Sequence, residues 1–177
     1  MNVVIRNIGD DLGPAKILLL HDQASGLEAI VVVDNTACGP AIGGVRMATD
    51  VSVEEVFRLA RAMTFKNAAA GLAHGGGKAG IIADPTCEPA QKERLVRTFA
   101  RRIGNLTDYI PGPDMGTNET CMAWIKDEID RAVGLPRVIG GIPLDEIGAT
   151  GLGLAVAAEV AAPAIGLDLR EARVAVQ

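Results

Sequence analysis

Lys66, Lys78 and Asp114 are charged residues whose types and surroundings would suit acid–base chemistry. Lys78 follows three consecutive glycines in the stretch GLAHGGGKAG, residues 71–80. Because ordered glycine costs conformational entropy, such a run is expected mainly where the backbone turns sharply or lets another group come close. A lysine delivered at that point needs a partner, and Asp114 in the stretch DYIPGPDMG is a candidate.

Two lysines and one carboxylate that converge on a cleft can process a substrate that carries a carboxylate of its own. One lysine would hold that carboxylate, and the other would transfer a proton. A lysine works near neutral pH only where burial or a neighbouring cation lowers its pKa, and a buried glycine loop beside a second lysine would provide both. A simpler alternative stays open from the spacing alone: Lys66 as a solvated helix residue, and Lys78 with Asp114 as a surface ion pair.

Two phosphate-binding motifs are excluded by the residues at their key positions. A P-loop needs a glycine at its first position and a Ser or Thr after its Gly-Lys pair, but Leu72 and Ala79 occupy those places. A dinucleotide fingerprint needs G-x-G-x-x-G after a strand, whereas GLGLAV has Gly151, Gly153 and then Val156 after a Gly/Pro-rich stretch. The sequence therefore predicts no phosphate-binding turn.

The composition is that of a globular chain. It has 177 residues, 49% of them hydrophobic, and a formal net charge of −5, which fits one domain of usual size or one domain and the beginning of another. No Lys/Arg cluster provides the electrostatic footprint for nucleic acid or an acidic membrane surface. Cys38, Cys87 and Cys121 lack zinc-motif spacing, so we expect no metal site.

The beginning of the chain, MNVVIRNIGDDLG, does not resemble a leader peptide. It lacks a basic segment followed by an apolar one, and the apolar runs further on are too short to span a bilayer. These patterns predict a cytoplasmic protein.

The first part of the chain is predicted to form a hairpin and then a helix. Residues 15–22 and 27–36 are short apolar runs, rich in β-branched residues, that the turn-forming QASG separates. A helix is expected from Ser52 to about Gly71, because Ser52 and Glu55 have the spacing of a capping box and apolar residues follow with a helical period.

From about residue 70 onward, predicted strands and helices alternate. They are a strand over 79–85, a helix over 88–105, a strand edge and Gly/Pro loop over 108–116, and a helix that begins at Thr117 or Asn118. This order predicts an α/β fold in three layers, with a mixed sheet that is largely parallel but has an antiparallel edge, and with helices on both faces.

The last part of the chain is expected to begin a second domain. A Gly/Pro-rich segment, residues 134–151, would form a loop or hinge, and it leads into an Ala-rich helix over 152–166 and a terminal strand over 170–177. A lone strand cannot easily bury both its faces, which suggests the start of a truncated Rossmann domain. We therefore place one domain at 1–147, and a connecting helix with the first strand of the next at 148–177.

Three segments carry a resemblance to a known family: GPAIGGVRM, LARAMTFKNAAAGLAHGGGKAGIIADP and PGPDMGTNETCMAWI. They resemble the N-terminal substrate-binding and dimerisation domain of the Glu/Leu/Phe/Val dehydrogenases, with motifs nearest those of the leucine-specific members. The resemblance runs from about residue 16 to the end, and it is most specific between Arg58 and Pro85. It implies oxidative deamination of an L-amino acid to a 2-oxo acid and ammonia, with NAD or NADP as the acceptor.

The resemblance also implies a role for each charged residue. Lys66 would bind the α-carboxylate of the substrate, Lys78 would activate the water that attacks the imine, and Asp114 would relay the proton of the amino nitrogen. Thr150 would contact the nicotinamide. The rest of the cofactor would be bound by a nucleotide domain that this chain lacks, because the family continues into that domain where the chain stops.

The side-chain pocket implied by the resemblance consists of Ile42, Gly43, Gly44, Met63 and Gly112. Glutamate-specific members have a lysine where this chain has Ile42, so the resemblance predicts an apolar substrate. Gly112 is smaller than the alanine common at that place in the family, which predicts a pocket deep enough for phenylalanine.

Two other functions remain open at this stage. The chain would form a homo-oligomer through this domain, so it could be an oligomerisation or regulatory module without catalytic activity. A residue from another domain could also supply the missing cation and make the enzyme a glutamate dehydrogenase. Under the main hypothesis, the chain on its own would be inactive because it holds no dinucleotide.

Overall fold

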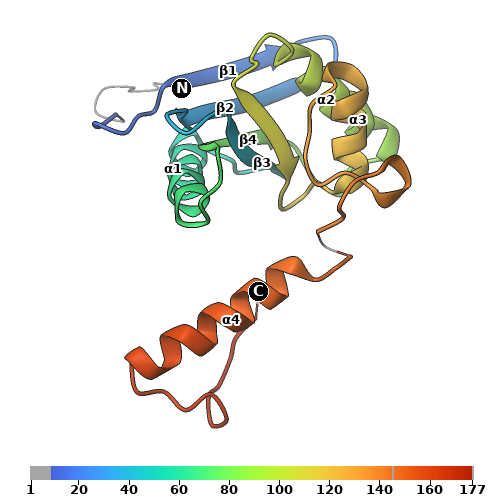
Figure 1. Ribbon diagram of the computed structural model, residues 1–177. Helices are drawn as coiled ribbons and strands as arrows, with labels where there is room; N and C mark the ends of the chain where they lie inside the picture. The colour runs from blue at the N-terminus through green and yellow to red at the C-terminus, as the bar shows by residue number, and fades with distance from the viewer. Residues whose placement is uncertain (1–8, 145, 177) are drawn as a thin grey trace. The chain divides into compact units, whose positions relative to one another are not determined.

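A computed structural model describes residues 9–144 and 146–176 of the chain (Figure 1). The chain divides into two compact units, the first ending at Ile142 and the second beginning at Pro143. Residues 1–8, part of the beginning on which the prediction of no leader peptide rests, lie outside the described residues. No helix in the described parts of the chain is long and apolar enough to cross a membrane.

The first unit is built on one five-stranded sheet. In their order across the sheet, the strands are β1 (Lys16–Asp22), β2 (Leu27–Asn35), β4 (Gly75–Ile82), β3 (Ala41–Ala48) and β5 (Tyr109–Pro113). Only β2 runs against the other strands, since it is antiparallel to β1 and β4, whereas β3 is parallel to both β4 and β5. The predicted hairpin and the largely parallel sheet with an antiparallel edge are thus confirmed.

Helices cover both faces of this sheet, as predicted. Helix α1 (Val53–Ala69) lies on one face, and α2 (Pro89–Arg102) and α3 (Glu119–Ile129) lie on the other (Figure 1). Beneath α1 a small apolar cluster joins Val56 and Ala60 of the helix to Ile30 and Val32 of β2. The three layers give the strands a fixed support from both sides.

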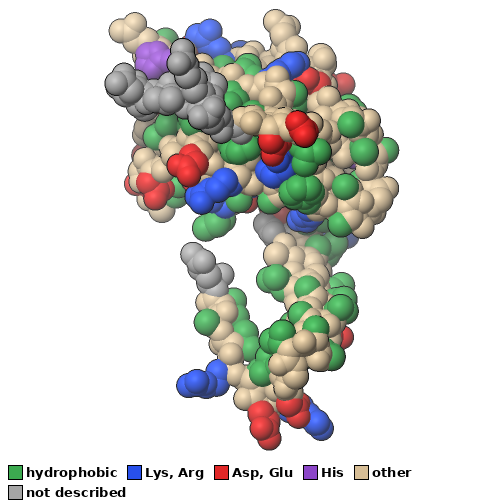
Figure 2. Space-filling view, turned by 90° about the vertical axis from the view of Figure 1, so that its left-hand side faces the viewer, with side chains coloured by type: hydrophobic (Ala, Val, Ile, Leu, Met, Phe, Trp, Pro, Cys, Tyr) green, Lys and Arg blue, Asp and Glu red, His purple; other side chains and the backbone are tan. Residues whose placement is uncertain are grey.

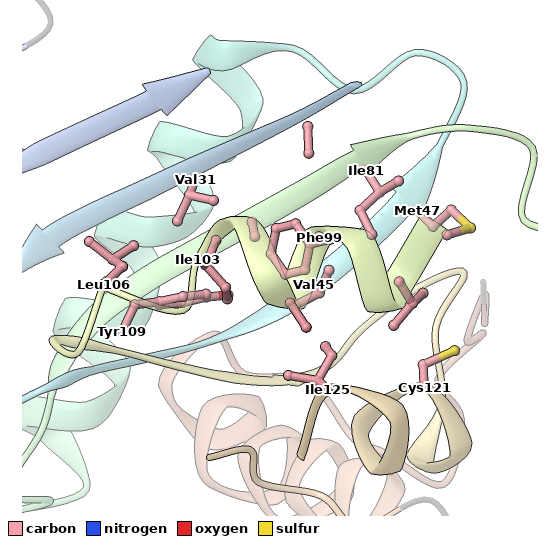
Figure 3. Close-up of a cluster of buried hydrophobic side chains, with 14 of the residues drawn as sticks. Val31, Val45, Met47, Ile81, Phe99, Ile103, Leu106, Tyr109, Cys121 and Ile125 are labelled. Carbon is pink, nitrogen blue, oxygen red and sulfur yellow. The ribbon is translucent and has the colours of Figure 1, made fainter. Parts of the chain in front are cut away.

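The main core fills the space between the sheet and helices α2 and α3 (Figure 3). Phe99 of α2, Ile125 of α3, Val45 of β3 and Tyr109 of β5 are fully buried there. Burying a side chain of this size contributes about 1.5–3 kcal/mol relative to leaving it exposed. This core therefore holds the sheet, and with it the ends of the strands, in a fixed position.

The glycine run lies inside strand β4, so the prediction of a glycine loop before the strand is wrong. A Cβ at Gly76 would lie 2.1 Å from the backbone nitrogen of Thr64 in α1, and one at Gly77 would lie 2.9 Å from the ring of Tyr109. The strand is thus pressed from both faces by neighbours that leave no space for side chains. Glycine's poor strand propensity is overridden by this packing, which the sequence alone does not reveal.

The predicted capping box of α1 is only half formed. The Ser52 hydroxyl accepts a hydrogen bond from the Glu55 amide at 3.1 Å, as expected for an N-cap. The Glu55 carboxylate, however, accepts a hydrogen bond from Arg46 of β3 at 2.5 Å. At α3, Asn118 is the N-cap and accepts from the Cys121 amide at 3.1 Å.

The second unit contains helix α4 (Ala149–Ala164), which confirms the predicted Ala-rich helix. Hydrophobic side chains lie exposed along it (Figure 2), among them Leu152, Leu154 and Val160. The structure assigns no strand to residues 170–176, so the predicted terminal strand is wrong for this described segment. A strand exists only through its ladder with another strand, and no described part of the second unit offers one.

Candidate active site

Lys78 lies on the face of the sheet that carries α1. Side chains alternate between the two faces of a strand, and Gly76 and Gly80, on either side of Lys78 in β4, both meet residues of the α1 layer. Next in the sheet is β3, whose residues Ile42, Gly44 and Arg46 are only half-buried. This side of β3 and β4 therefore combines a cation with accessible space.

Glycines beside Lys78 make room for its ammonium group. A Cβ at Gly44 would lie 3.3 Å from Lys78 Nζ and 2.7 Å from Asp114 Cβ. Gly44 pairs in turn with Gly112 of β5. Across β4, β3 and β5, the neighbouring residues are thus Lys78, Gly44 and Gly112, one lysine followed by two residues without side chains.

Lys78 and Asp114 form a buried ion pair. Lys78 is only 5% exposed, and its Nζ lies 3.0 Å from Asp114 Oδ2. Asp114 follows β5 directly, and its amide donates a hydrogen bond to the Thr117 hydroxyl, which itself donates to the Val45 carbonyl of β3. The alternative of a surface ion pair does not fit this burial.

The surroundings lower the pKa of Lys78 below its ordinary value. Burial is the largest cause, because it penalises the charged ammonium group. The Asp114 carboxylate acts in the opposite direction, whereas the charges of Arg46 and Lys66 add to the lowering. The resulting amine gives up its proton more readily than an ordinary lysine does, which is what a proton-transfer group needs.

Lys66 lies in the last turn of α1 with its side chain exposed. It makes no ion pair with any of the residues that the structure describes. Its charge is nevertheless close enough to influence Lys78. The exposed position of Lys66 leaves its ammonium group available for an anionic ligand near Lys78. Met63, one turn earlier on the helix, is half-buried.

Arg46 is a member of the cluster that the sequence analysis missed. Its Nε donates to Asp114 Oδ2 at 2.9 Å and its Nη1 to Glu55 Oε1 at 2.5 Å. Burial opposes the charge of this guanidinium, but the bonds to Asp114 and Glu55 outweigh it and raise the pKa of Arg46. Arg46 stands in the segment GPAIGGVRM, and the alternation along a strand would have placed it on the same face as Gly44.

The predicted side-chain pocket is only partly assembled on this face. Ile42 is half-buried, but Gly43 faces the other way, and its carbonyl accepts a hydrogen bond from the buried Tyr109 hydroxyl at 2.8 Å. A Cβ at Gly112 would lie 3.1 Å from Val133 Cγ2. Val133 thus lies next to Gly112, where the sequence predicts a pocket deep enough for phenylalanine.

Thr150 lies in the first turn of α4, in the second unit, with its side chain exposed. Its assignment to a nicotinamide contact stays a prediction. Within residues 9–144 and 146–176, no group of three or more His, Cys, Asp or Glu side chains is placed to hold a metal ion.

A second concave surface lies away from Lys78, on the α2 side of the sheet. This groove of about 520 Å³ has seven lining residues: Asp22, Ala24, Ser25, Arg94, Thr98, Arg101 and Arg102. Arg102 pairs with Asp22, and Arg101 donates to Glu128 and Thr98. Because two of its three arginines are bound to carboxylates, we regard the groove as part of the surface ion-pair network.

Comparisons with known proteins place the chain among amino acid dehydrogenases. A sequence model of the family described as "Glu/Leu/Phe/Val dehydrogenase, dimerisation domain" matches residues 15–131. The NAD-specific glutamate dehydrogenase of Clostridioides difficile is 41% identical, over 98% of this chain. The leucine dehydrogenase of Bacillus subtilis (strain 168) is 42% identical, over 71% of this chain.

A solved structure shows the same similarity. The hetero-hexameric glutamate dehydrogenase from Thermus thermophilus, in its leucine-bound form, superimposes with a TM-score of 0.76 at 34% sequence identity, over 88% of this chain. The chain spans 48% of the Clostridioides difficile protein, 35% of the Bacillus subtilis protein and 42% of the Thermus thermophilus chain.

Proposed function

Because this chain belongs to the Glu/Leu/Phe/Val dehydrogenase family, we propose that it is the substrate-binding part of an NAD(P)-dependent L-amino acid dehydrogenase and carries its catalytic lysine. The enzyme would convert an apolar amino acid to a 2-oxo acid and ammonia. The observation that carries the proposal is the environment of Lys78. This residue is 5% exposed, its ammonium group is bound to Asp114, and its pKa is below the ordinary lysine value. Stability alone gives little reason to bury such a lysine.

Lys66 would hold the α-carboxylate of the substrate. Its exposed ammonium group has no partner among the described side chains, so it can make a charge-assisted hydrogen bond with an incoming carboxylate. All amino acids share this group, which makes Lys66 a general anchor and leaves selectivity to other residues.

Lys78 and Asp114 would handle the protons. Asp114 uses Oδ2 for both of its cationic neighbours, and its Oδ1 accepts no hydrogen bond from the described residues. That free oxygen can exchange a proton with the amino nitrogen of the substrate. Lys78, when neutral, can take a proton from the water that adds to the α-carbon.

NAD or NADP, when bound, supplies the acceptor for the substrate hydride. The described residues have no glycine turn that would cradle its phosphates, and Thr150 is the one residue that we assign to it. The remaining work of this chain is to bind and orient the amino acid and to move its protons.

An apolar substrate is favoured by the side chains on the open face. Ile42 stands where a side-chain carboxylate would need a cation, and leaving a buried charge unpaired costs about 3–5 kcal/mol. An apolar side chain gains about 0.8 kcal/mol for each methylene that it buries. With Val133 against Gly112, a branched aliphatic side chain fits better than phenylalanine.

Glutamate is the second candidate substrate. It is favoured by one observation, the 41% identity with the NAD-specific glutamate dehydrogenase of Clostridioides difficile over nearly the whole chain. A residue of another domain could then supply the cation that Ile42 does not.

Substrate preference can be measured as kcat/KM for leucine, phenylalanine and glutamate with the full-length enzyme that contains this chain. We expect the order leucine, phenylalanine, glutamate, with a steep fall at glutamate. The variant Ile42→Lys should raise the glutamate value and lower the leucine value, with Ile42→Leu as the control. A glutamate value equal to or above that of leucine in the unmodified enzyme would favour the second candidate.

A module without catalytic activity is the alternative of a different class, and the description of the matching family model as a dimerisation domain makes it concrete. We expect the 177-residue chain to self-associate and to show no amino-acid-dependent reduction of NAD or NADP. Sedimentation at tens of micromolar and a coupled absorbance assay test both points. A monomer would contradict the first expectation, and turnover by the pure chain would contradict the second.

A further inference from the structure

We infer that Arg46 and Glu55 are positioning residues that hold the Asp114 carboxylate in place against Lys78. The inference rests on the proposed function and deepens it, because it assigns work to two residues that do not themselves touch the substrate. Arg46 comes from β3 and Glu55 from the first turn of α1. The two residues would thus connect a helix start to the proton-transfer group.

The geometry at Asp114 supports this assignment. Oδ2 accepts from Lys78 Nζ at 3.0 Å and from Arg46 Nε at 2.9 Å. Lys78 alone would hold Oδ2 through a long side chain of rotatable bonds, which can follow the carboxylate when it turns about its bond to Cβ. Arg46 Nε, which comes from a different strand and belongs to a planar group, holds the same oxygen from a second direction and leaves Oδ1 without a bond to either cation.

Glu55 in turn fixes Arg46. Its carboxylate accepts from Arg46 Nη1 at 2.5 Å, and its amide is bound to the Ser52 hydroxyl at the helix N-terminus. Glutamate at this position of a helix often bonds back to the N-cap amide. Here the Glu55 side chain binds Arg46 instead, so the helix start does without that stabilising bond and the charged cluster gains a contact.

Charged residues of both signs surround Lys78, and the charge of Arg46 offsets the effect of Asp114 on the pKa of Lys78. Asp114 follows β5, Arg46 is on β3, and Lys66 and Glu55 are on α1. The carboxylate of Asp114 stabilises the charged form of Lys78, and Arg46 counteracts it through its own positive charge. Without Arg46, Lys78 would be the only direct cationic partner of Asp114 and would hold its proton more firmly.

The first test measures the titration of Lys78 by NMR in the 177-residue chain with ¹³C,¹⁵N-labelled lysine. Arg46→Gln should shift the Lys78 midpoint to higher pH, whereas Arg46→Lys should keep it close to that of the unmodified chain. Arg97→Gln is the matched control, since Arg97 also joins several carboxylates, but on α2 and α3. An unchanged midpoint in Arg46→Gln, or an equal shift in Arg97→Gln, would overturn the inference.

The second test is a double-mutant cycle on kcat in the full-length enzyme. We expect Arg46→Gln to lower kcat by about 10- to 100-fold through misplacement of Asp114, with a smaller change in KM, and Glu55→Gln to lower kcat by less. Because Glu55 acts through Arg46, the double variant should be no slower than Arg46→Gln alone. Multiplying losses would show that Glu55 acts independently and would contradict the pairing.

The two tests separate this inference from the proposed function. The NMR titration needs neither substrate nor cofactor, so it can support the pairing even if the enzyme acts on another substrate. Absence of any dehydrogenase activity in the unmodified full-length enzyme would reject the proposed function. A normal kcat in Arg46→Gln, with activity present in the unmodified enzyme, would reject the positioning role alone.

Discussion

Two carboxylates of the first unit, Asp34 and Asp114, are both bound by arginine, but they differ in how many of their oxygens are bound within the protein. Asp34 of β2 is completely buried, and both its oxygens accept hydrogen bonds from Arg61 of α1. The Thr64 hydroxyl adds a further bond to Asp34 Oδ2 at 2.6 Å. Asp114 is partly exposed and shares a single oxygen between two cations.

Arg61 also binds Asp10, and these two partners, Asp10 first and then Asp34, raise the pKa of Arg61. Its guanidinium group lies over the ring of Phe57, 5.5 Å from the ring centroid. All three nitrogens of Arg61 and both oxygens of Asp34 are thus bound within the protein. The Asp34 cluster connects the beginning of the first unit to α1 and β2.

The difference teaches how a structural ion pair can be told from a site. A carboxylate with both oxygens bound inside the protein has little to offer a ligand, and its removal takes a buried partner from its arginine. A carboxylate with one oxygen free, beside a lysine of lowered pKa, can still bind and exchange a proton. Substitutions in the two clusters should therefore have opposite effects on stability and activity.

The largest effect is expected for Lys78→Ala, which should lower kcat of the full-length enzyme by about 10³-fold through loss of proton transfer. The fold should survive, because Asp114 keeps its bond to Arg46. Steady-state kinetics and thermal unfolding of the same sample measure both. Lys66→Ala is the companion variant and should mainly raise KM, since its contact is the same in ground and transition states. Equal effects on kcat would show that the two roles are wrongly divided.

Asparagine substitutions in the two carboxylates should give the next largest effects. Asp34→Asn should lower the free energy of unfolding by about 3 kcal/mol, because the half-buried Arg61 loses a partner. Asp114→Asn should cost about 1 kcal/mol, since Lys78 can release its proton instead of staying charged and buried, but it should lower kcat by about 10²-fold or more. Denaturant unfolding and kinetics of both variants decide, and a reversed pattern would remove the distinction between the clusters.

The smallest effect concerns the pH dependence of stability. Because the pKa of Lys78 is lower in the folded state than in the unfolded state, the unfolded chain binds more protons between those two values. Stability should therefore rise with pH through that window, up to the ordinary lysine pKa. The comparison is the free energy of unfolding of the unmodified chain minus that of Lys78→Met, measured from neutral pH to about 10. A difference that stays flat would mean that Lys78 titrates normally.

The helices could be predicted because their signals are local. Ser52 and Asn118 both bind an amide three residues on, and Pro89 stands at the beginning of α2. The hairpin was equally accessible, since a turn sequence separates two apolar runs. Such features depend on neighbours in the chain, and packing of the complete fold does not alter them here.

The candidate site could be predicted only in part. Lys66, Lys78 and Asp114 could be singled out by residue type and surroundings, and the family resemblance gave each a role, whereas Arg46 and Glu55 depend on the order β4, β3, β5, which brings distant segments together. Glu55 also fitted a local motif so well that its second role was hidden. The glycine strand was missed for the converse reason, because the contacts that require glycine come from other parts of the sequence.

The glycines of β4 restrict where this protein can change over evolutionary time. A Cβ at Gly75, Gly76, Gly77 or Gly80 would come within 3.0 Å of another atom, so the strand that carries the lysine has almost no room for neutral drift. Under the proposed function, variation in substrate recognition would fall on β3 and on the segment after α3, at Ile42 and Val133. In that case the proposed proton-transfer lysine and the residues proposed to select the substrate lie on different strands, and new substrates could be acquired without changing Lys78.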